Sequence, residues 1–130
     1  MKPQSVCIII ENSRRDVLLL LRDDIPTIQY PNHWVTLGGQ MEAGESPKEA
    51  IRRELQEEIE FSPKKLSLVK TYDWPEKTEY IFHTIAEIDV STTPLHEGQR
   101  LSWFSPTAIK SMRLAFHDNQ ILDDFLNSRK

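Results

Sequence analysis

The stretch of sequence that decides the fold runs from residue 38 to residue 61 and reads GGQMEAGESPKEAIRRELQEEIEF. Its second half carries the signals of a helix N-terminus: Ser46 is a favoured cap residue, Pro47 suits the first helical position, and Glu49 stands three residues after the cap. At about 100° per residue, the next apolar positions share one stripe of this helix, namely Ile51, Leu55 and Ile59. We therefore expect an amphipathic helix that begins at Pro47 and packs its stripe against a core.

The same helix carries three carboxylates on another face, about 100° from the apolar stripe: Glu54, Glu57 and Glu58. Their spacing brings carboxylate oxygens onto adjacent turns, and such a surface suits a hard divalent cation such as Mg²⁺ or Mn²⁺. From the spacing alone, the alternative is a solvated acidic face braced by Arg52 and Arg53.

The acidic charge of the chain is concentrated in this stretch. From Glu42 to Glu60 seven acids stand against three bases, whereas the rest of the chain has thirteen of each, which gives a net charge of −4. This balance argues against sequence-independent binding to a nucleic-acid polymer or to an anionic membrane. With 130 residues we expect one domain over residues 1–130. The single cysteine, Cys7, can form no internal disulfide, and this favours a reducing, cytoplasmic setting. We expect Cys7 to be a small buried hydrophobic residue.

Short apolar runs outside the stretch predict strands. These runs are Val6–Ile10, Val17–Leu21, Trp34–Thr36, Leu66–Tyr72, Tyr80–Ile88 and Leu101–Phe104. We expect the first two to pair, and the first is too short for a secretory signal or a membrane span. Two late helices are expected, one that begins at Pro106 with Ser105 as its cap and one over Asn119–Leu126 with Asp118 as its cap.

Eight residues of the stretch match the Nudix box, which is G, five residues, E, seven residues, and then R-E-apolar-x-E-E-x-G-apolar. They are Gly39, Glu45, Arg53, Glu54, Leu55, Glu57, Glu58 and Phe61. The chain therefore resembles the MutT-type branch of the Nudix hydrolases, and Arg22, Trp34 and the Glu97-Gly98-Gln99 run add to the likeness. Glu60 departs from the box, because it occupies the last glycine; a left-handed backbone there costs glutamate about 1 kcal/mol.

The resemblance implies an α/β fold, an α/β/α sandwich with a mixed, curved sheet. It also implies Mg²⁺-dependent hydrolysis, with Mn²⁺ as a substitute, of a pyrophosphate bond in a nucleoside diphosphate linked to another group. We expect a purine nucleoside triphosphate, ordinary or oxidised, to be converted to monophosphate and pyrophosphate. The alternatives are a nucleotide-sugar, ADP-ribose or dinucleotide pyrophosphatase and a non-catalytic nucleotide-sensing module. The expected partner is a small-molecule nucleotide, with no membrane or nucleic-acid polymer, and the chain is expected to be a monomer or a homodimer.

By the same resemblance, the metal ligands are the backbone carbonyl of Gly38 and the side chains of Glu54, Glu57, Glu58 and Glu97. Either Glu54 or Glu97 accepts the proton of the attacking water. Arg53 is expected to orient the carboxylates, and Glu45 to support the loop through a hydrogen bond.

Three residues outside the box are candidates for substrate binding, and each has a structural alternative. Arg22 either reaches a phosphate or a base edge or is a surface arginine at a strand end. Trp74, in a loop, either stacks on a base or belongs to the core. Asn119 either pairs with a purine edge or satisfies local backbone groups near the start of the last helix.

Overall fold

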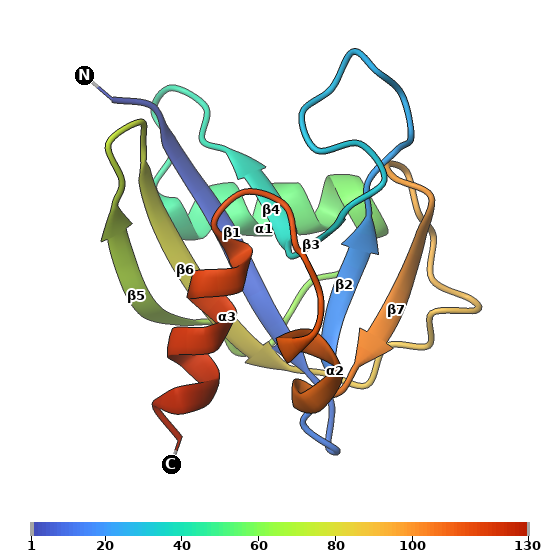
Figure 1. Cartoon of the computed structure of the whole chain (residues 1–130). Helices are drawn as coiled ribbons and strands as arrows, with labels where there is room; N and C mark the ends of the chain where they lie inside the picture. Colours follow the sequence, from blue (N-terminus) through green and yellow to red (C-terminus); the bar gives the residue numbers. More distant parts are fainter. Residues whose placement is uncertain (1, 130) are drawn as a thin grey trace.

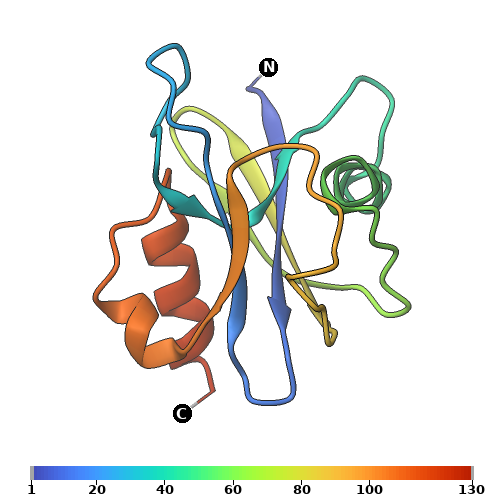
Figure 2. The same ribbon diagram turned by 90° about the vertical axis from the view of Figure 1, so that its right-hand side faces the viewer.

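The computed structural model describes residues 2–129, which form a mixed seven-stranded sheet between layers of helix (Figures 1 and 2). The elements in chain order are β1 (Gln4–Glu11), β2 (Val17–Leu21), β3 (Trp34–Val35), β4 (Leu37–Gln40), α1 (Pro47–Ile59), β5 (Ser67–Asp73), β6 (Thr78–Ile85), β7 (Arg100–Phe104), α2 (Pro106–Lys110) and α3 (Asp118–Asn127). In Figure 2, α1 lies on one side of the sheet, and α2 and α3 lie on the other. This arrangement confirms the α/β/α sandwich.

Strand β1 is the centre of the core, because both of its faces are covered. Val6, Ile8 and Ile10 pack with the apolar stripe of α1, whereas Cys7 and Ile9 pack with the buried residues of α3. Alternate residues of a strand point to opposite faces, so a run of apolar residues is required where both faces are buried. This explains why the sequence shows a continuous apolar run here and no alternation.

One edge of β1 has two partners, β4 along its first half and β2 at its end, and the sheet therefore divides there. This division positions the site. β1 pairs with β6 in parallel over its whole length, and on its other edge Ser5 to Ile8 pair with β4 in the antiparallel sense. At its far end β1 meets β2, with Glu11 opposite Val17, which confirms the predicted pairing of the first two strands. β3 pairs with β2 and β4 with β1, so the chain crosses the division at Thr36.

The structure adds β4, a strand that the sequence does not predict. A Cβ atom on Gly38 would lie 2.1 Å from the carbonyl oxygen of Val6, so only glycine lets β4 approach β1 this closely. A glycine pair is usually typical of a turn or a bulge, and its close pairing is visible only in three dimensions.

The predicted cap of the last helix is wrong. Asp118 is the first residue of α3, and the cap residue His117 makes no side-chain cap hydrogen bond. The Asp118 carboxylate is buried and accepts hydrogen bonds from the backbone N–H and the hydroxyl of Thr36 instead. The caps at Ser46 and Ser105 are confirmed. Within residues 2–129 no helix combines the length and the apolar composition needed to cross a membrane.

Candidate active site

The acidic face of α1 is turned towards the glycine pair of β4. The capping box at Ser46 sets the start of the helix, and the buried apolar stripe fixes its rotation against the sheet. With this rotation Glu58 is buried, Glu54 is largely shielded and Glu57 is exposed. The exposure of the three carboxylates therefore increases from Glu58 through Glu54 to Glu57.

Arg53 holds the exposed side of this face together. Its guanidinium donates two hydrogen bonds to Glu45, at 2.5 and 3.0 Å, and further ones to Glu54 at 3.1 Å and Glu57 at 2.9 Å. A fifth hydrogen bond goes to the carbonyl oxygen of Gln40, at 3.1 Å. The hydrogen bonds between Arg53 and Glu45 raise the pKa of the guanidinium and lower that of the carboxyl. Arg53 thus joins the loop, the end of β4 and two carboxylates of the helix.

The glycine pair leaves room for the carboxylates on the inner side. A Cβ atom on Gly39 would lie 2.5 Å from Oε1 of Glu54, so a larger residue there would displace the carboxylate. The backbone N–H of Gly38 donates to Oε1 of Glu58 at 3.2 Å. The backbone of the glycine pair therefore lies directly against the carboxylates of Glu54 and Glu58, because no side chain separates them.

Glu58 has no cationic partner among the described residues, whereas Glu54 accepts a hydrogen bond from Arg53. Burial, together with the charges of Glu54 and Glu97, raises the pKa of Glu58 to about 9. Burial also raises the pKa of Glu54, although Arg53 opposes the shift. A divalent cation would remove this repulsion, and a cluster of carboxylate oxygens beside a backbone carbonyl is the donor set that Mg²⁺ and Mn²⁺ prefer. The donor types present therefore fit the implied metal, although among the described residues no three of Glu54, Glu57, Glu58 and Glu97 bring their oxygens within 4.8 Å of one another.

Glu97 reaches this cluster from the loop before β7. The loop is anchored on both sides, since the N–H of His96 donates to the carbonyl oxygen of Glu58 at 2.9 Å and the N–H of Gln99 donates to that of Leu21 at 2.8 Å. Gly98 has φ of +88°, and a Cβ there would lie 2.6 Å from a Leu20 methyl group. The loop therefore rests closely on β2, and it places Glu97 in the same cavity as Glu58, where its charge acts on Glu54 and Glu58.

Glu60 has the left-handed backbone that the box assigns to glycine, with φ of 54° and ψ of 42°. Its carboxylate contacts Nε2 of His96 at 2.5 Å. The departure from the box thus leaves the turn in place and adds a contact to the loop that carries Glu97.

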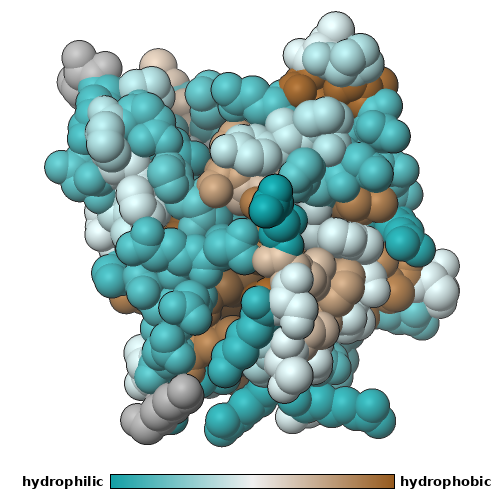
Figure 3. Space-filling model, viewed as in Figure 1, coloured by the Kyte–Doolittle hydropathy of each residue, from teal (hydrophilic) through white to brown (hydrophobic). Residues whose placement is uncertain are grey.

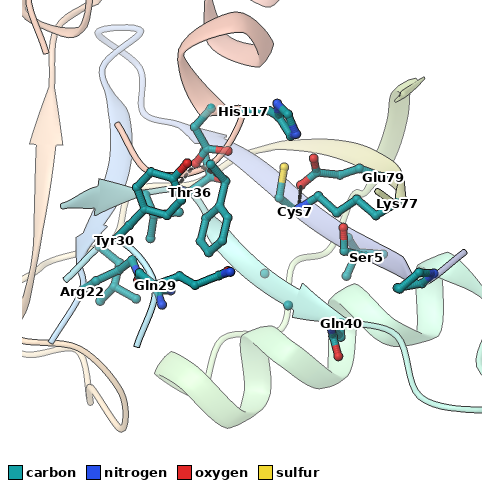
Figure 4. Close-up of a pocket in the computed structure, with 18 of the residues that line it drawn as sticks. Ser5, Cys7, Arg22, Gln29, Tyr30, Thr36, Gln40, Lys77, Glu79 and His117 are labelled. Atoms are coloured by element: carbon teal, nitrogen blue, oxygen red, sulfur yellow. Dashed lines mark hydrogen bonds and ion pairs between the residues drawn. The ribbon is translucent and has the colours of Figure 1, made fainter. Parts of the chain in front are cut away.

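A cavity of about 460 Å³ lies beside the glycine pair (Figure 4). Its lining includes Gly38, Gly39 and two carboxylates of the acidic site, Glu58 and Glu97. It also includes buried polar groups and two aromatic rings, among them Cys7, Thr36, Glu79, Asp118, Tyr30 and Phe116. We call the part formed by Cys7, Glu79 and Asp118 the floor of the cavity. On the face shown in Figure 3 hydrophilic side chains predominate, and apolar ones are exposed in separate patches.

The structure brings one of the three substrate-binding candidates to the cavity. Arg22 lines it; its Nε donates to the carbonyl oxygen of Gln29 at 2.9 Å, and its guanidinium lies 5.1 Å from the centre of the Phe116 ring. Arg22 is thus positioned on the aromatic side of the cavity, as Figure 4 also shows.

Trp74 and Asn119 have structural roles among the described residues. Trp74 stacks between Tyr72 and His117, with ring centres 4.7 and 3.8 Å away, and donates to Glu79 at 3.0 Å. The Asn119 amide accepts from the N–H of Leu114 at 2.8 Å and donates to the carbonyl oxygen of Met112 at 2.9 Å. Neither side chain is among those lining the cavity.

Asp118 is a cavity residue that the sequence does not predict. It stands beside Asn119, it is 2% exposed, and it accepts both hydrogen bonds from Thr36. Burial raises its pKa to about 7. The sequence does place an aspartate at the start of this helix, where its side chain can either cap the helix or face the interior. Only the contact with Thr36, 82 residues away, distinguishes the two roles.

A family model described as the NUDIX domain matches residues 1–125, and the chain therefore belongs to the Nudix domain family. It is 34% identical over 70 residues to the 8-oxo-dGTP diphosphatase of Escherichia coli K12, a match that covers 52% of this chain and 54% of that protein. It is 41% identical over 54 residues to nucleoside triphosphatase NudI of Enterobacter, covering 42% of this chain and 37% of that protein. These matches thus span about half, or less, of the curated relatives.

The fold extends over the whole of a solved neighbour. A structure from work on MutT of Aliivibrio salmonicida and Vibrio cholerae superposes with a TM-score of 0.81 at 22% identity, covering 98% of this chain and 99% of that one. The predicted family and its MutT-type fold are confirmed.

Proposed function

We propose that this chain is a Mg²⁺-dependent pyrophosphohydrolase of nucleoside diphosphates linked to another group. Its preferred substrate is a purine nucleoside triphosphate, ordinary or oxidised, and the products are monophosphate and pyrophosphate. The observation that carries the proposal is the buried Glu58, which has no cationic partner among the described residues, is repelled by the charges of Glu54 and Glu97, and lines the cavity together with Glu97. The activities named for the two curated relatives support it. The unpaired Cys7 suits a reducing, cytoplasmic setting.

In this proposal Glu54, Glu57, Glu58, Glu97 and the Gly38 carbonyl hold the cation. Bound there, Mg²⁺ would neutralise phosphate charge and lower the pKa of an attacking water. Glu54 or Glu97 would accept the proton of that water, since both carboxylates belong to the proposed site.

Arg53 and Glu45 are positioning residues in this site. The two hydrogen bonds from Arg53 to Glu45 tie the helix face to the loop after β4, and the bonds to Glu54 and Glu57 limit the rotamers of both carboxylates. Such support from outside the ligand set is required where ligands must keep a fixed geometry.

In this proposal the nucleobase binds on the aromatic side of the cavity. Tyr30 and Phe116 lie with ring centres 4.8 Å apart and offer apolar faces, while Arg22 lies against Phe116. At the floor, the Asp118 carboxylate is held by Thr36 and can accept a hydrogen bond from a base edge. We assign to Asp118 the base contact that the sequence suggested for Asn119.

A screen of nucleotides with Mg²⁺ tests the proposal when phosphate and pyrophosphate release are both measured. Purine triphosphates should release pyrophosphate, and chelator should abolish turnover until Mg²⁺ or Mn²⁺ is restored. Glu57→Gln should reduce kcat about a hundredfold, because an amide is a poor ligand for a hard cation. Asp123→Asn, an exposed position on α3, is the matched control.

Other results of the screen would redirect the proposal. Turnover confined to a nucleotide sugar, ADP-ribose or a dinucleotide would replace the triphosphate assignment and keep the metal site. Tight nucleotide binding with no product would identify a sensing module. Turnover that persists in excess chelator would overturn the metal-dependent reaction.

A further inference from the structure

Three groups able to bind metals meet at the floor of the cavity. They are Cys7 of β1, Glu79 of β6 and Asp118 of α3, and one atom of each lies within 4.8 Å of the others. All three are buried, with exposures of 4%, 5% and 2%. Figure 4 shows Cys7 and Glu79 side by side, with Lys77 below them. The proposed Mg²⁺ site uses none of them.

Each carboxylate of this cluster has one oxygen that accepts hydrogen bonds and one that accepts none, although the second oxygen of Glu79 forms a long ion pair with Lys77. Thr36 donates both of its hydrogen bonds to Oδ2 of Asp118, and Trp74 donates to Oε1 of Glu79. Among the described residues no hydrogen bond reaches Oδ1 of Asp118 or Oε2 of Glu79. Neutral donors that hold one oxygen and leave the other available are the usual support of metal-binding carboxylates.

A neighbouring hydroxyl gives independent evidence that a ligand belongs here. Ser5 is 6% exposed, lines the same cavity, and its Oγ has no hydrogen-bond partner among the described residues. Ser5 lies opposite Glu79 in the β1–β6 register and shares its strand face with Cys7. Buried hydroxyl groups are almost always paired, so a polar ligand at the floor would satisfy this one.

The nearest cation leaves the cluster undercompensated. Nζ of Lys77 lies 3.8 Å from Oε2 of Glu79, too far for a hydrogen bond, and 5.2 Å from the centre of the Phe116 ring. Burial and the charges of Asp118 and Glu79 raise the pKa of the Cys7 thiol. A cation that binds more strongly than Lys77 would favour the thiolate and both carboxylates.

We propose that Cys7, Glu79 and Asp118 form a second metal site, for a thiophilic divalent cation of the zinc class. A thiolate ligand selects such a cation over Mg²⁺, and three protein ligands leave a fourth position open to the cavity. Binding forms the Cys7 sulfur–metal bond and releases the thiol proton to solvent. Since this floor is where the proposed function places the base, the cation competes with the nucleotide; only this competition depends on the proposed function.

Titration of the full chain with Co²⁺ in excess Mg²⁺ tests the site. One equivalent should give the near-ultraviolet charge-transfer band of a thiolate–cobalt bond, and Cys7 is the chain's single cysteine. Cys7→Ser should lose the band, and Asp118→Asn should weaken Co²⁺ binding at least tenfold. Lys77→Gln should strengthen it, since it removes the competing ammonium, and Glu58→Gln should leave it unchanged.

Absence of the band in the folded wild-type chain, or its persistence in Cys7→Ser, would overturn the second site. Because the band needs no turnover, the two proposals fail separately. A chain that shows the band but hydrolyses no nucleotide supports the second site and contradicts the proposed function. In an active chain, Zn²⁺ should raise KM for the nucleotide at least tenfold more than it lowers kcat, and Cys7→Ser should be resistant.

Discussion

Two glutamates are almost fully buried, but one has cationic partners and the other has none among the described residues. Glu11, at the end of β1, is 2% exposed and contacts Nε2 of His83 at 2.7 Å and the guanidinium of Arg129. Glu58, on α1, is 4% exposed and receives one backbone hydrogen bond, from Gly38. Their pKa values move apart, below the ordinary value for Glu11 and to about 9 for Glu58.

The difference separates a carboxylate that holds the fold from one that serves a ligand. The partners of Glu11 come from β6 and from the residues after α3, so the contact closes the sheet against the last helix. Nothing in the described residues supplies a positive side chain to Glu58, while Glu54 and Glu97 add repulsion. Buried charges are expected to be paired or to coordinate metal, and these two residues show each case.

The largest expected effect is the loss of turnover in Glu58→Gln. We expect kcat to fall at least a hundredfold, because an amide is a poor ligand for a hard cation. Without metal the melting temperature at neutral pH should not fall, since a carboxyl with a pKa of about 9 is already protonated there. Thermal melts with and without Mg²⁺ check this: the wild type should be stabilised more than the variant. Equal stabilisation would remove Glu58 from the cation site.

Glu11→Gln should break the other half of the comparison. It leaves Arg129 without its carboxylate, and we expect about 2 kcal/mol of lost unfolding free energy, less than for a fully buried pair because Arg129 can reach water. Chemical denaturation measures the loss, and kcat of the folded variant should stay within about twofold. A large loss of kcat with unchanged stability would reverse the roles assigned to the two glutamates.

The pH dependence of stability sharpens the assignment of Glu11. Its pKa in the folded chain lies below the ordinary glutamate value of 4.5, so its stabilising contribution is fully present above that pH. The contribution is lost as the pH falls through the folded pKa, because protonation removes the charge that binds Arg129. Denaturation of wild type and Glu11→Gln from neutral pH to pH of about 3 should show the two stabilities converging below about 4.5. A constant difference across this range would mean that the charge of Glu11 does not stabilise the fold.

The smallest expected effect concerns Glu60, two residues after Glu58. Glu60→Gly removes the cost of a left-handed glutamate and should raise the unfolding free energy by about 1 kcal/mol. It also removes the contact with His96, whose worth is small because both side chains are about half exposed. Glu60→Ala, which keeps the strain and removes the contact, is the matched control and should not gain stability. No gain in Glu60→Gly would mean that the His96 contact compensates the strain fully.

Much of the fold follows from patterns that act over a few residues. The capping box, the stripe of α1 and the apolar runs of β1 and β2 depend on neighbours within two turns or one strand, so the sequence alone predicts them. The spacing of Glu54, Glu57 and Glu58 places their carboxylates together for the same reason. The Nudix box lies within one such local stretch, so the family, and with it the α/β/α arrangement, could be predicted from the residues themselves.

Only the tertiary structure decided which distant residues share a site. The closeness of Gly38 to Val6, the choice of Asp118 over Asn119 at the cavity, and the partners of Glu11 all depend on the sheet register and on the seating of α3. A shift of one residue in β1 would turn Glu11 to the other face of the sheet. Local preference set the helices and most strands of this protein, whereas packing set β4 and the pairing of buried polar groups across 72 to 118 residues.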